Sequence, residues 1–200
     1  RAPVRPNFFR AATNNDVENK YGYRYGKWLT ASLYAKCEFV GISKGDFSCK
    51  IEYAYDLPNL QDEKVHLVYE VYGDGKIIVD MTYQPVSSEI EMPVFGLIFQ
   101  LYKDMEEVNY YGFGPEENYI DRNKGALLGK YAYQVTDNLT PYLYPQECGN
   151  RTHVRELSVA GENTNLTVKG EDFEFTALHY TPYELENARH KDELPNTYQT

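Results

Sequence analysis

Regular alternation of apolar and polar residues marks the first half of this chain. From Phe47 to Leu57 every second residue is apolar or aromatic, and charged or small residues occupy the positions between them. Successive side chains of a β-strand point to opposite faces of its sheet. The pattern therefore predicts a strand with one buried face.

A second alternation folds about a turn. Apolar residues alternate over 65–71 and again over 77–83, on either side of Gly73-Asp74-Gly75. Glycine-containing turns of this kind join adjacent antiparallel strands. Folding about Asp74 places all the apolar side chains on one face, so turn and pattern predict the same hairpin. The predicted pairs are Val71 with Ile77, Tyr69 with Val79, and Leu67 with Met81.

Weaker patterns predict the remaining elements. The segment up to Asp16 is expected to be irregular, and one short helix is expected around Trp28, between Lys20 and Ser32. Thr181 to Glu184 form a capping box with Pro182 at the first helical position, which predicts another short helix ending near His190. The further strands are expected over 95–101 and 106–111 and, in shorter form, near 156–160, 166–169 and 173–178.

Strands without strand–helix alternation predict an all-β, antiparallel sandwich. Two hundred residues suit one domain with its own core. We divide this domain, 1–200, into an irregular leading segment (1–16), a loop and short helix (17–32), the sandwich (33–180), and a short helix with a tail (181–200). The chain begins with Arg1 rather than Met, so we expect it to be a piece of a longer protein.

Charge and hydropathy exclude several classes of partner. The formal net charge of −10 disfavours nucleic acid and anionic membranes, since phosphates would be repelled. No apolar run approaches the roughly 20 residues that span a bilayer. The three cysteines are expected to be buried, reduced thiols, with a Cys37–Cys49 bridge across a hairpin turning at 41–46 as the alternative. The compartment stays open between cytoplasm and periplasm.

Two polar runs, 112–122 and 140–155, carry the candidate chemistry. The glycines and proline at 112–115 are expected to end a strand, and the polar groups that follow need internal partners or water. A retaining glycosidase needs two carboxyl groups about 5 Å apart, but the spacing here defines no such pair. We favour a salt-bridge network that holds long loops, with contact to sugar or to a partner domain as the alternative. The residues considered are Glu116, Glu117, Asp121, Glu147, Glu156, Arg122, Arg151 and Arg155.

No residue of the chain is assigned a catalytic role. The four histidines and three cysteines lack the spacing of a zinc site. No nucleophile, phosphate-binding or dinucleotide-binding motif is present either. We therefore expect no metal and no cofactor in this part of the protein.

Three segments resemble the C-terminal small-chain region of the β-galactosidases of glycoside hydrolase family 2. Residues 8–16 are similar to the family's Phe-Trp-Arg-Ala-Pro-Thr-Asp-Asn-Asp, with Phe9, Ala12 and Asn14 at the positions that differ. The polar runs contain Gly-Pro-x-Glu-x-Tyr-x-Asp-Arg and Pro-Gln-Glu-x-Gly-Asn-Arg-Thr, followed by His153 where the family commonly has Asp. The resemblance covers nearly the whole chain.

This resemblance implies a galactose mutarotase-like supersandwich, here truncated at its C-terminus. Its implied partner is a catalytic (β/α)₈ barrel domain or large subunit, which removes terminal β-D-galactose from galactosides with retention. The catalytic glutamates lie in that barrel, and any Mg²⁺ or Na⁺ belongs to other domains. The implied role of the chain is to support the active site and assembly. Alternatives are a stand-alone carbohydrate-binding module with exposed tyrosines and an aldose 1-epimerase-like enzyme.

The resemblance also implies two sets of site residues. In relatives the loop after Asp16 approaches the active site, which makes a first set of candidates: Asp16, Val17, Glu18, Asn19, Lys20 and Tyr21. The second set is the motif network, expected to be structural: Glu116, Glu117, Asn118, Tyr119, Asp121, Arg122, Gln146, Glu147, Asn150, Arg151 and Arg155.

Overall fold

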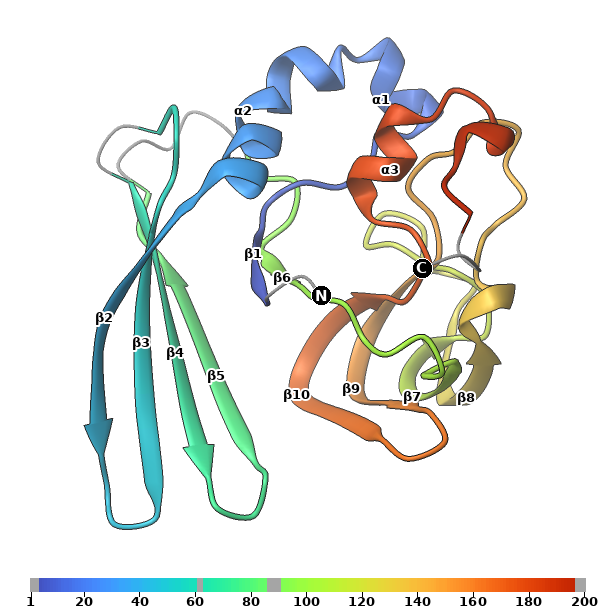
Figure 1. Cartoon of the computed structure of the whole chain (residues 1–200). Helices are drawn as coiled ribbons and strands as arrows, with labels where there is room; N and C mark the ends of the chain where they lie inside the picture. The colour runs from blue at the N-terminus through green and yellow to red at the C-terminus, as the bar shows by residue number, and fades with distance from the viewer. Residues whose placement is uncertain (1–3, 61–62, 86–90, 197–200) are drawn as a thin grey trace. The chain divides into compact units, whose positions relative to one another are not determined.

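The computed structural model describes residues 4–60, 63–85 and 91–196 (Figure 1). Its contact pattern divides the chain into two compact units. The first unit comprises Arg1–Arg10 and Asn15–Phe99, and the second comprises Ala11–Asn14 and Gln100–Thr200. Each unit has its own four-stranded sheet and its own apolar cluster. The single domain expected for 1–200 stays a prediction.

A four-stranded antiparallel meander forms the main sheet of the first unit. Its order is β2-β3-β4-β5, so each strand pairs with the next one along the chain. The strand predicted over 47–57 is confirmed as β3. The bounds are β2 (Lys36–Lys44), β3 (Ser48–Asp56), β4 (Lys64–Tyr72) and β5 (Ile77–Tyr83).

The predicted hairpin of β4 and β5 is confirmed, register included. Val71 lies opposite Ile77, and the other two predicted pairs are also observed. Gly75 adopts a φ of 89°, a left-handed conformation that glycine takes at little cost. The shared apolar face is buried at Val65 and Leu67 but exposed near the turn, where Ile77 is 54% exposed.

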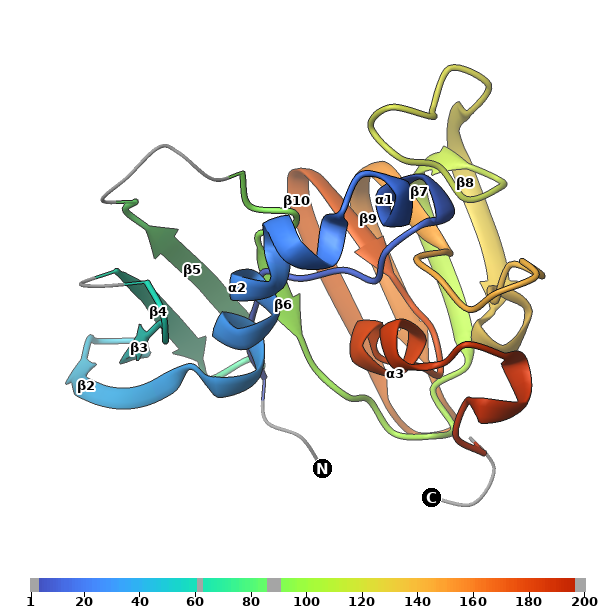
Figure 2. The same ribbon diagram turned by 90° about the horizontal axis from the view of Figure 1, so that it is seen from above.

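Helix α2 (Tyr21–Tyr34) confirms the helix predicted around Trp28. Trp28 is buried against Phe8 and Leu67 in the apolar cluster of the unit, and its indole N–H donates to the Glu91 carbonyl at 2.8 Å. Figure 2 shows α2 beside a short strand pair, β1 (Arg5–Asn7) and β6 (Gly96–Ile98).

The leading segment is more regular than predicted. It contains β1 and the start of α1 (Asn14–Glu18), where the sequence predicted irregular structure up to Asp16. Strand β6 is shorter than the strand predicted over 95–101. The apolar side chains there pack as aromatic contacts instead, such as Phe95 stacked on Phe8 with centroids 6.3 Å apart.

The second unit is built on another antiparallel sheet, of order β10-β9-β7-β8. Its strands are β7 (Glu107–Gly114), β8 (Leu127–Gln134), β9 (Asn150–Ala160) and β10 (Asn165–Thr176). Strand β8 was not predicted. The two short strands predicted near 166–169 and 173–178 are one strand, β10, with a register shift between Lys169 and Phe173.

The strands predicted beside the two polar runs are too short. Strand β7 extends three residues beyond the predicted end at Tyr111 and ends at Gly114, so the glycines and proline at 112–115 do end it. Gly112 itself has no room for a side chain. A Cβ on Gly112 would lie 2.9 Å from the Cα of Val154 on β9. The second run also enters the sheet, since β9 begins at Asn150 and not near Glu156.

The capping box at the C-terminal helix is confirmed. The side chain of Thr181 accepts from the Glu184 amide, and Glu184 accepts from the Thr181 amide in return. Helix α3 (Pro182–Asn187) ends three residues before His190, and a 3-10 turn, η2 (Lys191–Glu193), follows. A second 3-10 turn, η1 (Val135–Asp137), follows β8.

The thiol expectations hold only in part. All three cysteines are free, and the alternative bridge is excluded because the β2–β3 register pairs Cys37 with Tyr55 and Cys49 with Lys44. Only Cys148 is buried, whereas Cys37 is exposed. Burial raises the pKa of the Cys148 thiol to about 11, so this thiol stays protonated at neutral pH.

Every strand pairing among the described residues is antiparallel, and three short α-helices accompany ten strands. The all-β, antiparallel fold class is thereby confirmed, with one helix more than the sequence predicted. Across 4–60, 63–85 and 91–196, no helix has the length and apolarity needed to cross a membrane.

Candidate functional site

The polar run after β7 folds into a compact loop with a tight turn. The amide of Arg122 donates to the Tyr119 carbonyl at 2.8 Å, and the amide of Tyr119 donates back to the Arg122 carbonyl at 3.3 Å. Ile120 and Asp121 occupy the tip, and both are exposed. The turn thus fixes the backbone at the end of the first polar run.

The carboxylate of Glu117 joins this loop to the loop before β9. It accepts from the Thr140 hydroxyl and the Gly149 amide, both at 2.7 Å, and from the Tyr142 hydroxyl. The guanidinium of Arg122 completes the set with a 2.7 Å ion pair. We call these five residues the Glu117 network. It connects two segments more than 20 residues apart in sequence.

The Glu117 carboxyl is held in its charged form. Burial alone would raise its pKa, but hydrogen bonds from Gly149, Tyr142, Thr140 and Arg122 outweigh burial and lower the pKa. Carboxylates that accept several hydrogen bonds are poor proton donors at neutral pH. Glu117 therefore has the properties of a structural acceptor and not of a general acid.

Asn118 connects the same loop to β9. Its side chain is 2% exposed and donates to the carbonyls of Phe113 and Glu116, both at 3.0 Å. Its Oδ1 accepts from the amide and the hydroxyl of Thr152, at 3.0 and 2.6 Å. The backbone amide of Asn118 also donates to the Asn150 carbonyl. One buried amide thereby satisfies polar groups of both the loop and the sheet.

Arg151 is a buried cation. Among the described residues, the groups that accept its hydrogen bonds are neutral. Its Nε donates to the Tyr110 hydroxyl at 3.0 Å, and Nη1 donates to the carbonyls of Gly149 and Asn150. The guanidinium also lies 5.0 Å from the ring centroid of Tyr133. Cation–π contact and carbonyl acceptors, which the sequence pattern did not predict, replace the expected carboxylate partner.

Asn150 and Gln146 extend the contacts of the second run. Asn150 donates to the Asn118 carbonyl at 3.0 Å and to the Glu174 carboxylate at 2.9 Å. Gln146 accepts from the Asn14 amide and donates to the Tyr144 carbonyl, both at 3.3 Å. Both side chains are buried. The second run is therefore fixed along its length by its own polar groups.

The remaining motif residues lie outside the Glu117 network. Glu116, Asp121 and Arg155 are exposed, and Glu147 is half-buried. Arg155 donates to the His153 carbonyl at 2.8 Å and lies over the ring of Tyr111. Glu156 pairs with Lys169 on the neighbouring strand. Of the three arginines expected in salt bridges, only Arg122 forms an ion pair with a carboxylate within the described residues.

Tyr119 departs from this pattern of satisfied groups, as does Tyr133 in the sheet. Its hydroxyl is buried and has no hydrogen-bond partner among the described residues, while Arg122 lies 5.2 Å above its ring. Burial first, and then the nearby carboxylates of Glu147 and Glu117, raise the pKa of this hydroxyl. Tyr119 therefore remains a neutral phenol.

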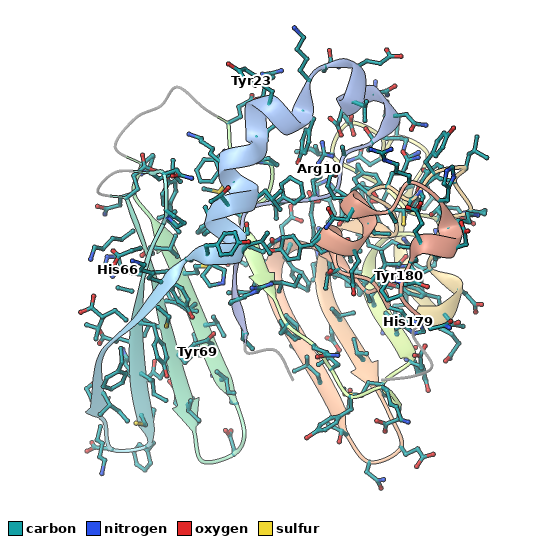
Figure 3. All side chains as sticks on the ribbon, turned by 45° about the horizontal axis from the view of Figure 1, so that its top comes forward. Arg10, Tyr23, His66, Tyr69, His179 and Tyr180 are labelled. Atoms are coloured by element: carbon teal, nitrogen blue, oxygen red, sulfur yellow. The ribbon has the colours of Figure 1, made fainter. Side chains whose placement is uncertain are left out.

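The first candidate set lies at the junction of α1 and α2 in the first unit. Asp16 forms an ion pair with Arg10 at 2.6 Å, and the Tyr21 hydroxyl donates to the Arg10 carbonyl at 3.1 Å. The Arg10 guanidinium also covers the Tyr21 ring. Figure 3 labels Arg10 and, on α2, the 92% exposed Tyr23.

Exposure separates the members of this set. Lys20 adopts a left-handed φ of 57° at the start of α2 and is exposed, as are Val17, Glu18 and Asn19. Tyr21, by contrast, is 2% exposed. The exposed stretch 17–20 is therefore the part of this set that is open to another molecule.

Several residues of these contacts were not singled out from the sequence. Thr140 and Tyr142 lie inside the second run, so their position could have suggested a role. Thr152 lies in the same run and ends its Pro-Gln-Glu-x-Gly-Asn-Arg-Thr motif. Tyr110 and Asn138 gave no such signal, although Asn138 is buried and donates to the carbonyls of Gly149 and Ala177. Among the described residues, no three His, Cys, Asp or Glu side chains are arranged to hold a metal ion.

Comparison with known proteins gives a consistent assignment. The family model "Beta galactosidase small chain" matches residues 2–200. A β-galactosidase of Streptococcus thermophilus is 38% identical over 190 residues, which is 94% of this chain and 18% of that protein. A β-galactosidase of Halalkalibacterium halodurans is 36% identical over 99% of this chain and 20% of its own length.

Another relative, from Latilactobacillus sakei, is a β-galactosidase small subunit. It is 30% identical over all of this chain and 72% of its own length. The chain thus spans about a fifth of the β-galactosidases named above and most of a small subunit. With nearly every residue matched by the family model, this chain belongs to the β-galactosidase small-chain family.

Proposed function

We propose that this chain is a non-catalytic β-sandwich domain of a β-galactosidase, and that it supports the active site and the assembly of the whole enzyme. The observation that carries the proposal is the family match over residues 2–200, combined with relatives of which the chain spans only 18–20%. The remaining four-fifths of such a polypeptide would carry the hydrolysis of terminal β-D-galactose from galactosides. Its catalytic part would be a (β/α)₈ barrel, present as a domain or as a large subunit.

The geometry of the polar runs supports a non-catalytic role. A retaining glycosidase uses one carboxylate as nucleophile and one carboxyl group as acid. Glu117 is already engaged by four donors from its own chain. Its lowered pKa also opposes proton donation at neutral pH.

The exposed stretch 17–20 is proposed to approach the active site of the whole enzyme. The Arg10–Asp16 ion pair and the buried ring of Tyr21 fix both ends of this stretch. A fixed, exposed backbone can contribute side chains to a neighbouring domain without a large loss of entropy. Mg²⁺ or Na⁺, where the enzyme uses them, would be bound by other domains.

Hydrolysis of nitrophenyl-β-galactoside tests the proposal. The purified chain should show no turnover, whereas the same chain combined with the remainder of the polypeptide should restore hydrolysis. Turnover by the chain alone, surviving rigorous purification, would overturn the non-catalytic assignment. Galactose affinity of the chain alone would favour a carbohydrate-binding module, and mutarotation of fresh α-galactose would favour an epimerase.

A further inference from the structure

Strand β5 forms an edge of the first unit's sheet. Among the described residues β5 pairs only with β4, so one side of its backbone has no partner strand (Figure 1). Its first three residues, Ile77, Ile78 and Val79, are all apolar and exposed. A row of unpaired amides and carbonyls beside exposed apolar side chains is a template for another strand.

The other three edges of the four-stranded sheets carry features that oppose such pairing. Strand β2 has a bulge after Phe39 and a lysine at each end. Strand β10 has register shifts along its length, and β8 carries Lys130 with no acidic residue in the strand to face it. Bulges and edge lysines are common means by which proteins keep an edge strand from pairing. Strand β5 contains neither a lysine nor a register shift.

The hydrogen bonds of the β4–β5 hairpin fix which residues of β5 point their backbone outward. The amide of Tyr72 donates to the Lys76 carbonyl at 2.9 Å, so the backbone of Lys76 faces β4. In an antiparallel ladder this direction alternates from one residue to the next. The N–H and C=O groups of Ile78 therefore also face β4, and those of Ile77 and Val79 point to the free edge.

The β5 strand of a second copy, antiparallel to the first, fits this pattern in one register. With Ile78 opposite Ile78 of the second copy, the outward groups of Ile77 and Val79 face each other and can exchange hydrogen bonds. The same register sets Lys76 opposite Asp80 of the second copy, and the two-fold symmetry repeats this pair. Centring the pairing on Val79 would instead oppose Ile78 and Asp80, and centring it on Asp80 would oppose two aspartates.

The side chains are complementary in this register. Lys76, whose ammonium lies over the Tyr72 ring, and Asp80 are both exposed. Within the part of the chain that the structure describes, neither forms an ion pair. Ile78 shares the polar face of the sheet with Glu70, its partner on β4, so its exposed side chain lacks apolar cover there. Opposite charges and apolar pairs that face each other across strands both stabilise the pairing.

We propose that two copies of this chain associate through their β5 strands, which joins two four-stranded sheets into one sheet of eight strands. Most of the net charge of −10 lies in the second unit, so the first units of two copies repel each other only weakly. The inference goes beyond the proposed function and rests on the sheet of the first unit alone.

Sedimentation equilibrium of the 200-residue chain over a concentration series measures the Kd of the dimer. Wild type should show a reversible monomer–dimer equilibrium. Asp80→Lys and Lys76→Asp should each raise Kd about 10-fold or more, since two opposed pairs change from attraction to repulsion. Asp46→Lys is the matched control. It makes the same charge change at an exposed position between β2 and β3 and should alter Kd less than twofold.

An equimolar mixture of Asp80→Lys and Lys76→Asp tests the register itself. In a mixed dimer every lysine at positions 76 and 80 faces an aspartate of the other chain, so association should return to the wild-type Kd. Thermal unfolding followed by circular dichroism verifies that the exposed substitutions leave the fold intact.

Three results would overturn the proposal. They are a wild-type chain that stays monomeric at every concentration, an equal loss of association in Asp46→Lys, and single variants that dimerise as wild type does. A mixture that fails to associate would overturn the register and the pairing with it. Each of these results would leave the proposed function standing, since that function is tested by hydrolysis and not by self-association.

Discussion

In the first unit, the sheet is held by apolar contacts around Trp28, Phe8 and Leu67. In the second unit, apolar residues also form a cluster, but the loops at the ends of β7 and β9 are held by polar groups such as the half-buried Glu117 and the buried Asn118. Apolar packing is non-directional and degrades gradually when volume is lost. Buried polar networks depend on every partner, since one unpaired group costs more than one bond contributes.

Removing the central side chain of the first unit should give the largest effect. Trp28 is 2% exposed, and Trp28→Ala should lower the free energy of unfolding by about 3–5 kcal/mol, through lost burial and the cavity left behind. Denaturant unfolding followed by circular dichroism measures this. Trp28 is the single tryptophan, so its own fluorescence cannot report on the variant.

The division of the chain into two units also predicts which part of the protein Trp28→Ala destabilises. Hydrogen exchange should accelerate in the first unit and change little at Asn118 and Asn150. Equal acceleration in both units would contradict the division of the chain into two separately stabilised parts.

Removing one buried amide of the second unit should give the next largest effect. Asn118→Ala leaves the Thr152 amide and the carbonyls of Phe113 and Glu116 without their partner. A loss of about 2–4 kcal/mol is expected, because each unsatisfied buried group costs about 1–3 kcal/mol. Asn109→Ala, which removes an exposed bond to Glu107, is the control and should change stability by less than about 0.5 kcal/mol. A similar loss of unfolding free energy for the two variants would show that the buried hydrogen bonds stabilise the fold no more than an exposed one.

The two units also differ in how far their sequences predict them. Alternation and a glycine turn predicted the β4–β5 pairing residue by residue, because those strands have one apolar and one polar face. Strand β8 was missed because Leu127 and Leu128 interrupt its alternation. Strand β9 was predicted too short because its first residues, Asn150 and Arg151, are polar, and polar residues in sequence suggest a loop. In the structure both are buried.

The motif resemblance predicted that Glu117 belongs to a polar network, but not that it lies at the centre. Glu116 and Glu117 are adjacent and chemically identical, so only the folded backbone distinguishes the exposed residue from the half-buried one. Tertiary contacts over more than 30 residues, such as Glu117 to the Gly149 amide, leave no periodic signal in the sequence.

The difference in unfolding free energy between wild type and Glu117→Gln, measured from pH 7 to pH 3, tests the claim about Glu117 most directly. The folded-state pKa of Glu117 is lowered, so its charged form stabilises the protein above the ordinary glutamate pKa of about 4.3. Wild type should exceed the variant by about 1–3 kcal/mol at pH 7. This difference should shrink as pH falls below about 4.3 and through the lower folded-state value. A difference that stays constant or grows over this range would contradict the account.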